Sequence, residues 1–413
     1  MMAAILSKHN IYSEEQSGFS VSNIRELNKL LKIALLVRVV LCVFILVIGK
    51  EIGELYFISD DMMYESLAKA YIQMSNSIFD LDVLEQIGAA GYLQVFWPYT
   101  MCIFAYLFKS IYAVRFLNII LSTIAVKLVY DLTLNISGNH KTAIRAAKLY
   151  AFLPYPLIVC CFPIKDIYLT VAVLYAFVLF VKFQNRNKIS IIQIIVSILL
   201  LIGAYFTRGA IVEIMALFFI TFVIKRFYDS GNISAIFVCI IIVAVFLFLF
   251  GGTILDSFNT KIDDYGGYAE IDTTISAIQM SNITQIYKLP FTYFFASLQP
   301  IMLSLFSPST LKIWSLIICY GNLTIVPIAC GNFLYIFCKK KNLLFWICSA
   351  VMYSAVISLS LGIFRHYLFL LPIEIINYSL YCEQKSTVKR KKLIVVVYGI
   401  YILILLYSIV TLF

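Results

Sequence analysis

Long apolar runs recur along almost the whole chain and constrain its fold more than any other feature. From residue 33 to the C-terminus these runs come close to the ~20 residues with which a helix crosses about 30 Å of hydrocarbon. Composition agrees, because 62% of the 413 residues are hydrophobic and 13% are charged, whereas a soluble domain is about 25% charged. The sequence therefore predicts an all-α, polytopic integral membrane protein. The ten cysteines are scattered within the apolar runs, and we interpret them as small buried hydrophobic residues.

The distribution of positive charge predicts an orientation. The positive-inside rule assigns five short basic loops to the cytoplasm: Lys141/Arg145/Lys148, Lys182/Arg186/Lys188, Lys225/Arg226, Lys339–Lys341 and Lys389–Lys392. The two longest loops, at about 50–114 and 252–311, are acidic and are predicted to lie outside. The net charge of +10 is thus explained by the basic residues of the cytoplasmic loops, and it gives no reason to expect nucleic acid as a partner.

The sides of these loops constrain the number of crossings. An odd number of helices must connect the first acidic loop with the basic loop after residue 131, yet two apolar runs are present, 93–112 and 115–131. We expect 93–112 to be re-entrant or in-plane and 115–131 to span. We likewise expect that the run 291–309 does not span the membrane, because prolines break it. A single domain, 1–413, with about 11 spanning helices is predicted, the N-terminus inside and the C-terminus outside: 34–49, 115–131, 144–162, 167–183, 189–206, 209–224, 233–251, 312–338, 343–361, 366–381 and 393–412.

Carboxylates and cations are predicted to share the outer face. Asp60 and Asp61 follow the first span, and tight outer turns carry Lys165 with Asp166, Arg208, and Arg365 with His366. Ionisable groups at membrane depth cost about 2.5–3.5 kcal/mol each at the bilayer centre and therefore mark sites. This arrangement suits a sugar linked to a lipid phosphate. Cations would stabilise the leaving phosphate, one carboxylate would accept the proton of an incoming hydroxyl, and a second would hold a divalent metal or orient the acceptor.

Structural interpretations of the same residues stay open. Asp60 and Asp61 could cap a helix that begins near Met62, and Lys165–Asp166 could be an ion pair with Asp166 as a helix cap. Other cations could extend only to lipid headgroups: Arg208, Arg365 and His366 on the outer side, and Arg38 and Lys127 on the cytoplasmic side.

Three segments resemble the GT-C glycosyltransferases, in particular the protein mannosyltransferases and the lipid A aminoarabinose transferases. "SDDMMYESLAKAYI" resembles their Asp-Asp/Asp-Glu motif in the first outer loop. "GNHKTAIRAAKLYAFLPYPLIVCCFPIKDIYLTV" and "GIFRHYLFLLPIEI" resemble a later basic loop with a second acid and a late Arg-Tyr…Pro helix start. The likeness covers about the first 230 residues and then 290–380. The sequence departs from the pattern where His-Pro-Pro is reduced to "VFWPYT", and no large soluble domain follows the last helix.

The resemblance implies a GT-C-like bundle with juxtamembrane helices on the outer face. It implies an inverting glycosyltransferase that moves a sugar from a polyprenyl-phosphate donor to a glycan, lipid or protein acceptor. By position, Asp60 would be the general base, Asp61 would bind a metal (Mg, Mn or Zn) or the acceptor, and Asp166 would be the second acid. The remaining site residues would bind phosphate (Lys165, Arg208 and Arg365) or line the substrate cavity (Tyr64, His366 and Tyr367).

Two other functions remain open. "YFTRGA" is similar to the Thr-x-Arg turns of O-antigen polymerases, so a repeat-unit polymerase or ligase with a polyprenyl-diphosphate donor is the alternative. A lipid-linked sugar flippase ranks lower, because no internal repeat is visible. Richness in Ile, Lys, Asn, Tyr and Phe suggests an AT-rich bacterial genome. We therefore expect a multi-pass plasma-membrane enzyme of the cell envelope with its active site on the outer face.

Overall fold

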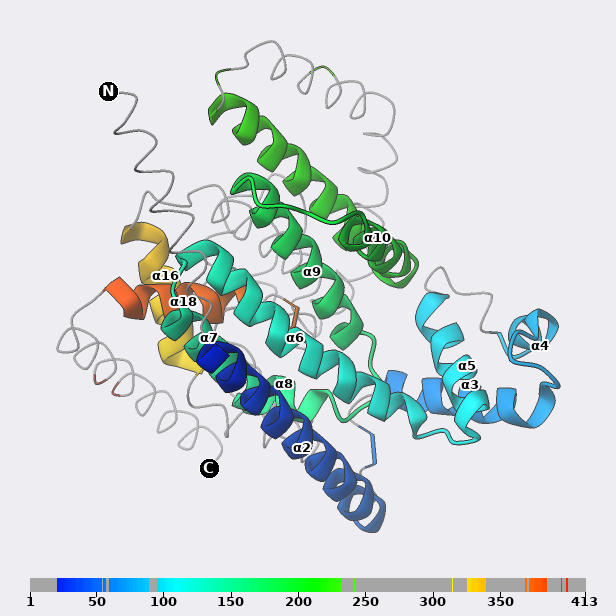
Figure 1. The fold of residues 1–413 in the computed structure, drawn as a ribbon. Helices are drawn as coiled ribbons and strands as arrows, with labels where there is room; N and C mark the ends of the chain where they lie inside the picture. The colour runs from blue at the N-terminus through cyan, green and yellow to red at the C-terminus, as the bar shows by residue number, and fades with distance from the viewer. Residues whose placement is uncertain are drawn as a thin grey trace, which may run out of the picture.

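The computed structural model describes residues 21–53, 55–56, 59–88, 95–229, 325–338, 368–369 and 371–384, and single residues 231, 241, 314, 395 and 399. Every regular element within these residues is a helix (Figure 1), as predicted. In chain order the helices are α2 (Val21–Glu51), α3 (Ser59–Met74), α4 (Leu81–Gln86), α5 (Phe96–Phe108), α6 (Ala113–Ser137), α7 (His140–Phe152), α8 (Pro154–Val159), α9 (Asp166–Gln184), α10 (Ile191–Asp229), α16 (Ile325–Cys338) and α18 (Leu371–Gln384).

Four described segments are long and apolar enough to cross a membrane: Ser22–Glu51, Ala113–Ser137, Asp166–Gln184 and Ile191–Arg208. The core lies around α9, because 83% of its most apolar stretch is buried, against 22% for α2 and for the first half of α10. A helix that is apolar on all sides is expected at the centre of a bundle. Its neighbours are α6 and α10, and α2 and α7 pack in turn against α6.

The lengths of α5 and α6 agree with the expectation that 93–112 does not span the membrane and that 115–131 does. With 13 residues α5 is too short to cross about 30 Å of hydrocarbon, whereas α6 has 25. Together with α3 and α4, α5 forms a small unit beyond one end of α6 (Figure 1). This unit has its own apolar cluster around Tyr71, whose hydroxyl donates to the carbonyl oxygen of Ile78 at 2.8 Å.

Within the described residues, the predicted span 144–162 is wrong. The run 144–162 is divided into α7 and α8, because Leu153 is extended (φ −64°, ψ 127°) directly before Pro154. A proline ring forces the preceding residue away from helical geometry, and its missing N–H suits the first helical position that Pro154 occupies. A second break falls where it was predicted, between 189–206 and 209–224, because Arg208 is non-helical within α10 (φ −162°, ψ 87°).

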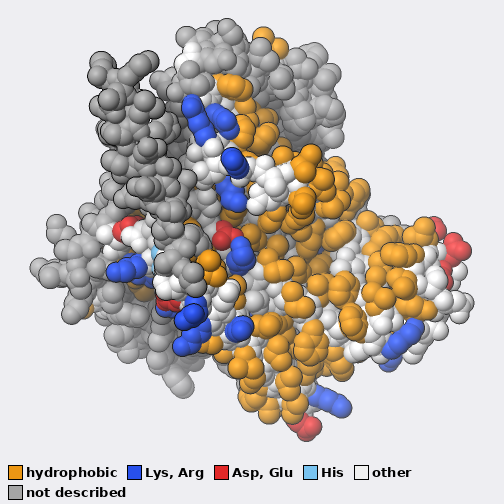
Figure 2. Space-filling model, viewed as in Figure 1, with side chains coloured by type: hydrophobic (Ala, Val, Ile, Leu, Met, Phe, Trp, Pro, Cys, Tyr) orange, Lys and Arg blue, Asp and Glu red, His pale blue; other side chains and the backbone are white. Residues whose placement is uncertain are grey.

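The two ends of the described bundle differ in charge. At one end α2 contacts α7, where Lys148 pairs with Glu26. The α9–α10 turn contacts the end of α6 through Asn185 and Asn135, and Arg226 donates to the carbonyl oxygen of Phe183 nearby. Figure 2 shows Lys and Arg gathered toward that side, a broad hydrophobic surface, and acidic side chains over α4 at the opposite edge. Several predicted features lie outside the described residues: the loop 252–311, the span 343–361, most of 233–251 and 393–412, and the residues Arg365, His366 and Tyr367.

Candidate functional site

A fully buried turn, 161–164, connects α8 with α9. This segment was predicted to be a tight turn on the outer face, and side chains from α5 and α6 cover it. A buried turn must have its carbonyl groups satisfied, and here four consecutive carbonyls accept side-chain hydrogen bonds. Arg115 donates to residue 161 at 3.4 Å, Asn118 donates to residues 162 and 164 at 2.7 and 3.0 Å, and Trp97 donates to residue 163 at 3.1 Å. The turn is therefore a defined platform for the start of α9.

A buried ion pair fixes α3 against α6 beside this platform. The Nε atom of Arg115 donates to Oε1 of Glu65 at 2.7 Å, and both side chains are withdrawn from solvent. Arg115 also donates to the carbonyl oxygen of Leu55 at 3.2 Å and lies within 6.0 Å of the ring centres of Tyr56, Tyr112 and Phe162. Burial, with the Glu65 carboxylate nearby, raises the pKa of the Tyr56 phenol. One guanidinium group thus links α3, α6, the turn and the segment after α2.

Asp61 and Tyr64 lie on the same face of α3 as Glu65. They precede Glu65 by four and one residues, and all three side chains are buried. The helix begins at Ser59 rather than near Met62, so Asp60 and Asp61 lie inside its first turn and do not precede it as caps. Carboxylates in a first turn are favoured by the helix dipole. The Asp60 side chain lies outside the described residues.

Asp166 is the most unusual charged residue next to the buried turn. It is fully buried as the first residue of α9, after Lys165 at the N-cap position, and no side chain caps this helix. Neither carboxylate oxygen of Asp166 has a hydrogen-bond partner among the described residues, and no ion pair joins it to Lys165. The capping and ion-pair interpretations of Asp166 are therefore wrong. Burying an unpaired carboxylate is costly, and such positions are concentrated at functional sites.

Arg208 belongs to the same end of the bundle. It lies five residues beyond Gly203, where a Cβ atom would collide with the hydroxyl group of Tyr168. That hydroxyl donates to the carbonyl oxygen of Leu200 at 2.8 Å, and the Tyr168 ring lies 5.0 Å from that of Phe96. The first half of α10 is therefore packed against α5 and α9 as it approaches Arg208.

The residues that hold the buried turn and α3 in place were not predicted from the sequence as site residues. Arg115 and Asn118 were predicted only as part of the span 115–131, and Glu65 was not among the predicted site residues. The detectable signal was their polarity near the start of an apolar run, where a buried charge needs a partner. Arg38 was predicted to extend to headgroups, which is wrong, because it is fully buried and its Nε donates to Ser122 at 3.0 Å. Lys127 is exposed and pairs with Asp131.

No family model, curated protein or solved structure matches the chain. Within the described residues, no three His, Cys, Asp or Glu side chains come together as metal ligands. The chemistry of the site is therefore derived from the chain's own side chains. The cysteines agree with their expected role, since five of the six whose side chains are described are buried and all six are reduced.

Proposed function

We propose that the chain is a membrane glycosyltransferase of the GT-C type, acting on a polyprenyl-phosphate-linked sugar. The observation that carries this proposal is the buried Asp166 carboxylate, which has no described partner and lies at the start of α9, directly beyond the buried turn. Asp61, Lys165 and Arg208 lie at the same end of the bundle. Acids and cations at one membrane depth suit a donor with a neutral sugar and an anionic lipid phosphate.

The residues account for each part of an inverting transfer. A carboxylate, Asp60 by its place in the resembling motif, accepts the proton of the acceptor hydroxyl as its oxygen bonds to the anomeric carbon. The bond between that carbon and the phosphate oxygen breaks on the opposite face, and both of its electrons leave with the lipid phosphate. Lys165, Arg208 and Arg365 balance the phosphate charge. Asp166 would accept hydrogen bonds from sugar hydroxyls and hold the ring in place.

Further parts of the proposal come from sequence alone. The acceptor is a glycan, lipid or protein of the cell envelope, and the reaction takes place at the outer face of the plasma membrane. Arg365 binds phosphate, and His366 and Tyr367 complete the substrate cavity. A divalent ion (Mg, Mn or Zn) at Asp61 belongs to the same proposal, and no step above depends on it.

Sugar transfer by membranes that carry wild-type or variant protein tests this function. They would be given radiolabelled polyprenyl-phosphate and polyprenyl-diphosphate sugars with a pool of envelope acceptors. We expect transfer from the monophosphate donor, lost in Asp60→Asn and Asp61→Asn but retained in Asp82→Asn, which removes an exposed carboxylate on α4. Turnover of the diphosphate donor alone would instead identify a polymerase or ligase. Full activity of Asp60→Asn and Asp61→Asn would contradict the catalytic role.

A further inference from the structure

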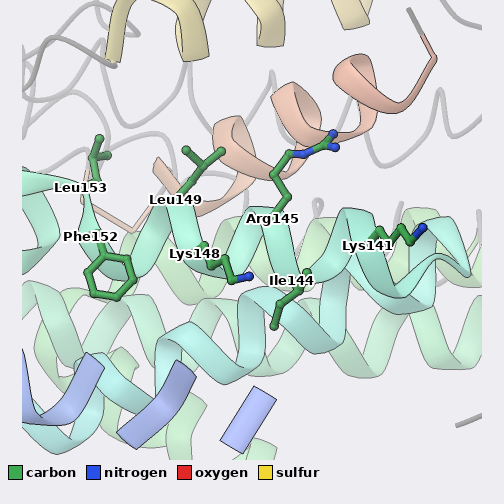
Figure 3. Close-up of a pocket in the computed structure, with 7 residues that line it drawn as sticks. All are labelled: Lys141, Ile144, Arg145, Lys148, Leu149, Phe152 and Leu153. Carbon is green, nitrogen blue, oxygen red and sulfur yellow. The ribbon is translucent and has the colours of Figure 1, made fainter. Parts of the chain in front are cut away.

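A basic groove runs along α7, at the opposite end of the bundle from the proposed active site. Its cations are Lys141, Arg145 and Lys148, spaced at i, i+4 and i+7 as one helix face requires. The groove measures ≈ 510 Å³, and its other described lining residues are apolar (Figure 3): Ile144, Leu149, Phe152 and Leu153. Three cations beside a row of apolar side chains form an amphipathic surface that the proposed reaction does not use.

The groove begins at a charged residue and ends among apolar residues, as the headgroup and the acyl chains of a phospholipid require. Lys141 lies in the first turn of α7, at the basic end of the molecule, and Phe152 lies in its last turn. At 1.5 Å per residue the two are about 16 Å apart along the helix axis. This distance exceeds the roughly 5–7 Å depth of one headgroup layer. A phosphate beside the cations would therefore place its acyl chains along Leu149, Phe152 and Leu153.

The charges around the groove leave two cations available for an anion. Glu26 of α2 accepts from Lys148 at 2.8 Å and lies 3.1 Å from His140, so it compensates Lys148. Lys141 is exposed, and Nη1 of Arg145 is shielded from water with no hydrogen-bond partner among the described residues. Neighbouring α2 adds exposed Arg25, Lys29 and Lys32 along a second groove of ≈ 540 Å³. The local field favours an anion.

We propose that the groove along α7 binds an anionic phospholipid, with its headgroup phosphate held by Lys141 and Arg145. Basic pockets between membrane helices on the cytoplasmic side recognise acidic headgroups in this way. Charge complementarity and the apolar inner half of the groove favour a lipid over a soluble anion, which would leave Phe152 and Leu153 unused. The site is independent of the proposed transfer reaction.

Lipid titration followed by native mass spectrometry tests the proposal. Purified protein would be titrated with phosphatidylglycerol or phosphatidylcholine, and bound lipid would be counted. We expect Lys141→Gln/Arg145→Gln to weaken phosphatidylglycerol binding by about fivefold per cation, or on the order of 25-fold for the pair, and to leave phosphatidylcholine unaffected. The matched control Lys50→Gln/Lys69→Gln removes two exposed cations elsewhere and should retain binding. Equal loss in both double variants would overturn the assignment.

Two further measurements distinguish lipid binding from misfolding of the variant and from binding of a soluble anion. Lys141→Arg/Arg145→Lys keeps both charges and should bind phosphatidylglycerol as the wild type does, so loss of binding there would also contradict the proposal. Millimolar inorganic phosphate should not displace the bound lipid. Displacement by phosphate in the wild type would mean that the groove binds a soluble anion, and the lipid assignment would then be wrong.

Discussion

Side chains donate a hydrogen bond to every carbonyl of the buried turn 161–164 that precedes Asp166, in addition to the backbone hydrogen bonds of the turn. Each carbonyl from 161 to 164 needs a donor because water does not reach it, and Asn118 supplies two of these bonds through one amide group. Backbone at this depth is tolerated only when its polar groups are satisfied by protein. The order of charged loops predicted a tight turn on the outer face at 162–168. Nothing local indicates which distant side chains will cover it.

Replacing Asn118 with Ala should destabilise the protein strongly. The buried carbonyl of residue 164 would lose its donor, at about 1–3 kcal/mol, whereas that of residue 162 would keep the backbone N–H of Ile164 at 2.9 Å. We expect the free energy of unfolding to fall by about 1–3 kcal/mol in chemical denaturation. The control Asn187→Ala changes an exposed amide in the α9–α10 turn and should have a small effect. Equal losses in both variants would show that the turn does not depend on Asn118.

Replacing Asp166 with Asn should stabilise the protein. The substitution keeps the shape of the side chain but removes a buried negative charge that has no described partner. We expect the free energy of unfolding to rise by on the order of 1 kcal/mol. A clear decrease would indicate that the carboxylate is compensated in the folded protein and contributes to its stability.

At the scale of elements, the proposed site requires that α3 is held against α6. The Arg115–Glu65 pair provides this attachment, and removing one member of a buried pair leaves the other charge uncompensated. Sequence patterns predicted a helix close to Asp60 and Asp61 and a non-spanning run at 93–112, the latter because the charged loops before and after it require an odd number of crossings. The division of 144–162 was missed, although Pro154 was a visible signal, because hydropathy does not register helix breaks.

The variant Glu65→Ala should therefore loosen α3 and leave the central helix intact. We expect faster amide hydrogen exchange in Ser59–Met74 and unchanged protection in Asp166–Gln184. Asp131→Ala removes an exposed ion pair with Lys127 and serves as the matched control. Unchanged exchange in α3 would contradict a role for the buried pair in its attachment.

At the scale of the whole molecule, the basic and acidic ends are proposed to face opposite sides of the membrane. Composition was sufficient to predict an all-helical protein with membrane-length apolar helices. The order of charged loops predicted which ends lie together, and the Asn185–Asn135 and Arg226–Phe183 contacts agree for one end. The site itself could not be derived in full, because Arg115, Asn118 and Trp97 converge from positions that share no sequence pattern.

The orientation can be tested with inserted sites for a sequence-specific protease. A site after Phe79, in the exposed turn between α3 and α4, should be cut in intact cells. A site after Asn187, in the basic turn between α9 and α10, should be cut only after the cells are permeabilised. The reverse pattern would place the proposed active site in the cytoplasm and exclude an outer-face donor.

The rate of sugar transfer by Asp166→Asn tests the central claim most directly. The rate would be measured with the polyprenyl-phosphate donor, at matched protein level and with Asp82→Asn as the control. We predict a loss of about 10²–10⁴-fold, the range for a positioned carboxylate in proton transfer or substrate alignment. A wild-type rate in Asp166→Asn would show that the buried carboxylate takes no part in catalysis, and the assignment of this end of the bundle as the active site would be contradicted.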